Sequence, residues 1–155
     1  KSPPAPVSSR GVLYLGKEAK LKIEGKVEFG PGTRIHLNNK AILSIGDGTF
    51  MHHDSAIITR RQISIGSGCA ISWGVNITDS DWHELQYPSR EEKKEFVSIG
   101  NNVWIGHNVS VLKGVTIGDG CVIGAGSVVC SDLPAGTLAA GVPASPIRTK
   151  IEWKR

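Results

Sequence analysis

The chain has 155 residues, enough for one domain with a modest core, and a formal net charge of +4. That charge suits a phosphate-bearing ligand, but no nucleic-acid motif and no stripe of mixed basic and aromatic residues accompanies it. No apolar run reaches membrane-spanning length, and no signal-peptide pattern is present. We therefore expect neither a nucleic-acid partner nor a transmembrane segment, and the 19 glycines argue against a helical protein.

An aliphatic residue returns every six positions along most of the chain. The repeat is loose in FGPGTR from residue 29, clearer in IGDGTF from 45 and IGSGCA from 65, and strongest from residue 99, in IGNNVW, IGHNVS, VLKGVT, IGDGCV and IGAGSV. A period of six fits neither an α-helix nor a plain strand, but it fits a short strand followed by a corner. We predict an all-β parallel β-helix with three sides and about 18 residues per coil, in which each leading Ile or Val points inward.

The repeat predicts three regions along the chain. Residues 1–28 are an N-terminal lead-in with the first irregular coils, 29–141 form the β-helix, and 142–155 are a C-terminal cap or tail that ends in a short basic helix. The register breaks twice, because Ile45 to Ile65 spans 20 residues and Ile65 to Ile99 spans 34. The second break predicts an inserted loop at about 81–96, and long loops in tight repeats are often functional.

The three cysteines show no metal or redox spacing. Cys69 and Cys121 both occupy the small fifth position of a hexad, in coils two apart, which at roughly 10 Å is too far for a disulfide. Free thiols of this kind are typical of the reducing cytoplasm, where we expect the protein to work.

These hexads, together with NNVWIGHNVSVLKGVTIGDGCVIGAGSVV and AAGVPASPIR, resemble the hexapeptide-repeat acyltransferases. The stretch ISWGVNITDSDWHEL is most similar to the sugar and polysaccharide O-acetyltransferase branch. The resemblance implies a left-handed β-helix, a homotrimer with its active site between neighbouring subunits, and acetyl-coenzyme A as acyl donor to a sugar or glycan.

The break in the repeat holds the candidate catalytic residue. Transfer of an acetyl group to an alcohol requires a base, and imidazole suits this role because it titrates near neutral pH. His83 is the only histidine in the predicted loop, and by resemblance it is the general base. The predicted substrate-binding residues are Asp79, Asp81, Trp82 and Arg60, although the two aspartates could instead cap turns and Trp82 could pack beneath the loop.

The late coils hold the predicted cofactor site. Ala125 and Gly126 keep one wall low, so a pantetheine arm can lie against the backbone. The resemblance adds the remaining cofactor-binding residues Gly106, His107, Cys130 and Arg148. Two positions depart from the family pattern: Cys130 stands where sugar acetyltransferases often have Thr, and Ser145 stands where some have Arg.

Two other functions fit a hexapeptide repeat. A zinc-dependent carbonic anhydrase of the gamma type needs three histidines around the metal, and His83 and His107 have no histidine five residues away, so we predict no metal site. A non-catalytic scaffold protein would bind no coenzyme A and would have no use for a histidine in the inserted loop. The sequence does not identify the sugar or the hydroxyl that is modified.

Overall fold

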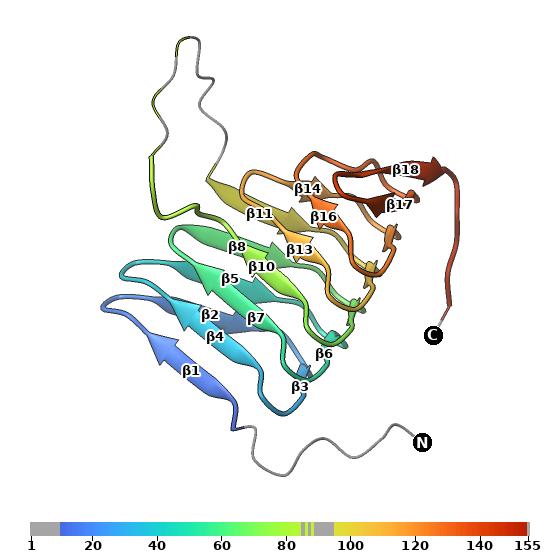
Figure 1. Cartoon of the computed structure of the whole chain (residues 1–155). Coiled ribbons are helices and arrows are strands. Elements are labelled where there is room, and N and C mark those ends of the chain that lie inside the picture. Colours follow the sequence, from blue (N-terminus) through green and yellow to red (C-terminus); the bar gives the residue numbers. More distant parts are fainter. Residues whose placement is uncertain (1–9, 85, 87, 89–94, 155) are drawn as a thin grey trace.

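Three sheets, parallel except for the last pair of strands, form the sides of a single β-helix (Figure 1). The computed structural model describes residues 10–84, 86, 88 and 95–154. Within them the first sheet, sheet A, contains β1 (Val12–Leu15), β4 (Arg34–Leu37), β7 (Ala56–Thr59), β10 (Asn76–Thr78), β13 (Ser110–Val111) and β16 (Val128–Val129).

The other two sides have the same construction. Sheet B contains β2 (Lys20–Ile23), β5 (Ile42–Ile45), β8 (Gln62–Ile65), β11 (Phe96–Ile99) and β14 (Thr116–Ile117). Sheet C contains β3 (Glu28–Phe29), β6 (Phe50–Met51), β9 (Ala70–Ile71), β12 (Trp104–Ile105), β15 (Val122–Ile123), β17 (Leu138–Gly141) and β18 (Ala144–Arg148). The fold is the all-β coil predicted from the hexads, and it is consistent with a left-handed β-helix. The described residues include no helix long and apolar enough to cross a membrane.

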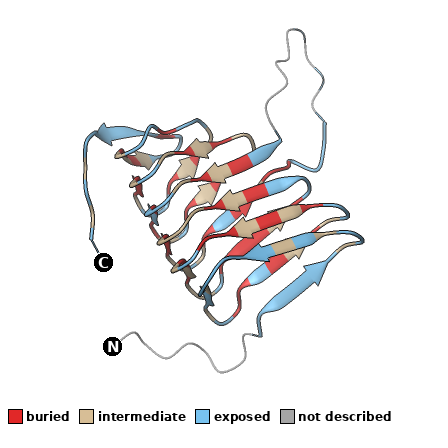
Figure 2. Cartoon of the chain, turned by 180° about the vertical axis from the view of Figure 1, so that it is seen from behind, coloured by how far each residue is buried: buried red, intermediate tan, exposed pale blue. Residues whose placement is uncertain are grey.

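The leading aliphatic residues form the core, as predicted (Figure 2). Ile45 pairs with Ile65 and Ile65 with Ile99, so both register breaks lie where the sequence places them. All three side chains are at most 3% exposed. Each coil thus buries its apolar side chains against the neighbouring coils, which is how stacked repeats gain stability.

The regular coils begin earlier than the predicted boundary at residue 29. β1, β2 and β3 already form a complete coil, and Val12 pairs in register with Arg34, which is 22 residues further along the chain. The inward-facing Leu13 and Leu15 of this coil are 56% and 47% exposed. They mark the N-terminal end of the core among the described residues.

The prediction of a C-terminal helix is wrong. β18 turns back and pairs antiparallel with β17, and residues 149–154 continue without helical structure. The pairing with β17 takes up residues 144–148, and Lys150 has a positive φ of 56°, which is incompatible with an α-helix. In the tail, the Trp153 Nε1 donates a 2.6 Å hydrogen bond to the carbonyl oxygen of Asn102, and its ring centroid lies 5.9 Å from that of Trp104.

Candidate active site

Two of the three edges where the sheets meet carry all of the predicted site residues except Arg148. The A–B edge consists of the turns that lead from sheet A to sheet B, at residues 16–19, 38–41, 60–61, 79–95, 112–115 and 130–132. The C–A edge consists of the turns that lead from sheet C to sheet A, at residues 30–33, 52–55, 72–75, 106–109 and 124–127. The predicted inserted loop joins β10 to β11 on the A–B edge, and its residues 85, 87 and 89–94 lie outside the described residues.

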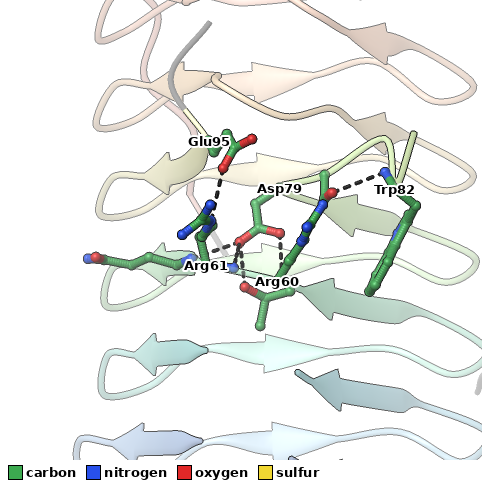
Figure 3. Close-up of polar contacts among 8 residues, drawn as sticks. Arg60, Arg61, Asp79, Trp82 and Glu95 are labelled. Carbon is green, nitrogen blue, oxygen red and sulfur yellow. Dashed lines mark hydrogen bonds and ion pairs between the residues drawn. The ribbon is translucent and has the colours of Figure 1, made fainter. Parts of the chain in front are cut away.

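A buried carboxylate organises the A–B edge beneath this connection (Figure 3). Asp79 is 0% exposed. Its Oδ2 accepts hydrogen bonds from the Thr59 hydroxyl at 2.5 Å and from the backbone N–H groups of Arg61 and Gln62 at 2.8 and 2.7 Å. Its Oδ1 accepts the backbone N–H of Arg60 at 2.7 Å. With both oxygens occupied in this way, Asp79 is a positioning residue of the turn, and we do not assign it a direct contact with substrate.

The residues that follow Asp79 are fixed by a second set of contacts. The Ser80 hydroxyl accepts the backbone N–H of Trp82 at 3.0 Å, and Trp82 has a positive φ of 63°. Asp81 forms a 2.5 Å ion pair with Lys113 from the next coil, with side chains 49% and 22% exposed. The chain entering the loop is therefore held by Asp79 on one coil and by Lys113 on another.

His83 comes directly after this anchored segment. Its side chain is exposed in the protomer, and among the described residues it has no hydrogen-bond or ion-pair partner. The ring is therefore accessible to a ligand. One protomer alone does not place it in a cleft.

The arginine pair 60–61 lies on the turn that Asp79 holds. Arg61 Nε forms a 2.9 Å ion pair with Glu95 Oε2. Figure 3 shows the Arg60 side chain running the other way, toward the start of the loop. A polar hollow of about 360 Å³ beside the pair is lined by Asn38, Asn39, Arg60 and Arg61.

Four of the six predicted cofactor residues come together on the C–A edge. The Gly126 N–H donates to the His107 carbonyl oxygen at 2.8 Å. A Cβ atom at Gly106 would lie 2.7 Å from the Ala125 nitrogen, so only glycine fits against this turn. Gly126 has a φ of 72°, and a Cβ atom there would point into open space. The edge is therefore low at Gly126, and an extended chain lying along the backbone here stays a prediction.

The other two predicted cofactor residues lie elsewhere in the protomer. Cys130 follows β16 on the A–B edge. Arg148 ends β18 and pairs with Leu138 at the start of β17, away from the C–A edge. No described contact joins either residue to the four on the C–A edge.

A ladder of aromatic rings on the C–A edge was not predicted. Trp73 stacks on His107 with a centroid distance of 4.8 Å and parallel planes, and on its other side its plane lies within 3° of the His53 ring at 6.0 Å. The signal for it in the sequence is the third position of the hexads MHHDSA, ISWGVN and IGHNVS. Only the stacking of the coils reveals that these positions form one column.

His83 and the C–A edge residues lie on opposite sides of sheet A. From Gly74 on the C–A edge to Asp79 on the A–B edge the chain crosses one strand, about 16 Å at 3.3 Å per residue. A single protomer therefore does not bring the predicted base and the predicted cofactor wall together. Among the residues that the structure describes, no three His, Cys, Asp or Glu side chains gather as potential metal ligands.

The reactivity of the cysteines tests the cofactor prediction. Burial raises the pKa of the Cys121 thiol, which suppresses the reactive thiolate, whereas Cys130 is only partly buried. We expect iodoacetamide at pH 8 to alkylate Cys130 faster than Cys121 in the native protein, as measured by mass spectrometry of peptides. Saturating acetyl-coenzyme A should slow alkylation of Cys130, and an unchanged rate would argue against its place in the cofactor site.

Comparison with known proteins agrees with the repeat and the fold. The family model "Bacterial transferase hexapeptide (six repeats)" matches residues 96–131. The "Uncharacterized 24.8 kDa protein in cps region" of Klebsiella pneumoniae is 37% identical over 149 residues, which cover 96% of this chain and 67% of that protein.

Two solved structures share most of this chain. The polysialic acid O-acetyltransferase OatWY is 32% identical with a TM-score of 0.81, over 90% of this chain and 68% of that chain. The acetyltransferase VCA0836 of Vibrio cholerae O1 biovar eltor, complexed with acetyl-coenzyme A, is 30% identical with a TM-score of 0.70, over 88% of this chain and 73% of that chain. This chain thus spans about two thirds to three quarters of the length of these proteins, and it belongs to the hexapeptide-repeat acetyltransferase family.

Proposed function

We propose that the protein transfers an acetyl group from acetyl-coenzyme A to a hydroxyl of a sugar or polysaccharide precursor. The observation that carries the proposal is the anchored loop entrance, which presents His83 as an exposed imidazole at the one long interruption of the repeat. A related structure holds acetyl-coenzyme A, and another belongs to a polysialic acid O-acetyltransferase, which supports a glycan as acceptor.

We assign separate roles in acetyl transfer to the residues of this chain. His83 takes the proton of the acceptor hydroxyl as its oxygen becomes bonded to the acyl carbon, and the same imidazole then returns the proton to the departing sulfur. Acetyl-coenzyme A supplies the acyl group as a thioester. Gly126 leaves room for its extended arm along the C–A edge, because a Cβ atom there would meet nothing within 4 Å. Gly106 lets the neighbouring turns stack closely, and His107 and Ala125 line the same edge. Asp81 and Lys113 hold the loop entrance that carries the base.

The arrangement also supports a homotrimer with shared active sites. Because His83 and the cofactor wall lie on opposite edges of sheet A, we propose that the A–B edge of one protomer faces the C–A edge of its neighbour. Acceptor and donor would then meet between protomers. Cys69, Cys121 and Cys130 form no disulfide, which is compatible with the reducing cytoplasm that we propose as its location.

A screen of acceptors tests the function directly. We expect release of free coenzyme A thiol from acetyl-coenzyme A when the protein is supplied with a suitable mono- or oligosaccharide, and mass spectrometry of the product should show one added acetyl group. The molecular mass in solution, measured by light scattering, should be three times that of the chain. A protein that neither binds coenzyme A nor acetylates any of a broad panel of sugars would instead be a scaffold.

A further inference from the structure

The polar hollow on the A–B edge offers free cationic and amide groups. Of its four lining side chains, two are already engaged: the Asn39 Oδ1 accepts the backbone N–H of Lys17 at 2.8 Å, and Arg61 pairs with Glu95. The Arg60 guanidinium and the Asn38 side-chain amide have no partner among the described residues. The hollow thus has two lining residues, Arg60 and Asn38, whose side chains remain available to a ligand.

Arg60 remains unpaired although a carboxylate lies directly beside it. Asp79 is fully buried, and its two oxygens accept hydrogen bonds from three backbone N–H groups and the Thr59 hydroxyl. It therefore fixes the backbone of Arg60 without neutralising its side chain. The main chain of Arg60 is therefore already ordered before a ligand binds, and binding has to order only the side chain.

The surroundings of Arg60 favour a negative ligand. Lys17 and Lys40 are exposed on the same edge in the two preceding coils, whose turns carry one acid, Glu18, and the Lys40 N–H donates to the Lys17 carbonyl oxygen at 2.8 Å. Figure 3 shows the Arg60 side chain pointing toward the start of the loop, between Asp79 and Trp82, whereas Arg61 turns toward Glu95. The free charge thus faces the segment that leads into His83.

We propose that Arg60 and Asn38 bind an oxyanionic group, the carboxylate or phosphate of an acidic sugar, and that this contact selects an acidic glycan as acceptor. The planar guanidinium matches the two oxygens of such a group, and the Asn38 amide can donate a further hydrogen bond. Binding there places the rest of the sugar beside the loop entrance and its Trp82. The inference rests on the proposed function, since it names the acceptor class of the same site.

The test compares Arg60→Gln with Arg61→Gln as its matched neighbour. Acceptors are trigalacturonate, glucose 1-phosphate and neutral maltotriose. We expect Arg60→Gln to lower the ratio of kcat/KM for trigalacturonate over maltotriose by about 10- to 100-fold, the scale of a hydrogen-bonded charge. Arg61→Gln should change the ratio less than about threefold, because its guanidinium is already paired. The glucose 1-phosphate arm shows whether carboxylate or phosphate is preferred.

A binding measurement separates this inference from the function on which it rests. Calorimetric titration of trigalacturonate and of glucose 1-phosphate into the protein without acetyl-coenzyme A needs no transfer. Binding of either that is lost in Arg60→Gln and kept in Arg61→Gln supports the inference even if transfer fails. Equal loss in both variants, an unchanged ratio in Arg60→Gln, or acetylation of neutral sugars alone would overturn it and leave the proposed function standing.

Discussion

Replacing His83 with alanine is expected to slow acetyl transfer at least about a hundredfold, the lower end of the range for a general base. The alcohol would have to attack the thioester without losing its proton to a positioned group. Because His83 is exposed and makes no described contact within the protomer, its removal should leave the β-helix and coenzyme A binding unchanged. Thiol release measures the first expectation, and calorimetry with coenzyme A measures the second.

His36→Ala is the control for this variant. His36 lies on β4, where its ring packs at a tilt of 39° against Tyr14 with a centroid distance of 4.4 Å, and it belongs to no predicted site. Its variant should transfer acetyl groups at the normal rate. If His83→Ala also retained near-normal transfer, the base would have to be sought elsewhere, although membership of the family would be unaffected.

Asp79→Ala is expected to lower the free energy of unfolding by about 3 kcal/mol or more. The substitution leaves three backbone N–H groups and the Thr59 hydroxyl without their acceptor, and each unsatisfied buried polar group costs about 1–3 kcal/mol. Water entering the hole would recover part of this loss. Urea denaturation followed by circular dichroism measures the change, at one protein concentration because assembly contributes to stability.

Asp81→Ala provides the matched comparison two residues away. Its carboxylate is 49% exposed and meets one lysine, so its loss should cost less than about 1 kcal/mol. Asp79→Asn keeps the shape but replaces one acceptor oxygen by a donor, and we expect it to fall between the two. An Asp79→Ala variant as stable as Asp81→Ala would show that the hydrogen bonds to this carboxylate contribute little.

Part of the site could be inferred before the fold was known. His83 stands out because a repeat of six residues is interrupted there, and Gly106 and Gly126 stand out because glycines recur at fixed hexad positions. These signals are local, so the sequence displays them. The roles of Asp79 and Lys113 are not local: Asp79 serves a turn about 20 residues earlier, and Lys113 reaches back 32 positions to Asp81.

The amino-acid sequence by itself determined the architecture, because an inward aliphatic residue every sixth position can be buried only if short strands stack in register. It also determined where Ile45, Ile65 and Ile99 pair and where the inserted residues leave the coil. Only the tertiary structure decided that the C-terminal segment forms a hairpin, that Asp79 faces inward, and that His83 and His107 lie on opposite edges of sheet A. Those outcomes depend on contacts between coils, whose spacing along the chain varies, and a one-dimensional period does not encode them.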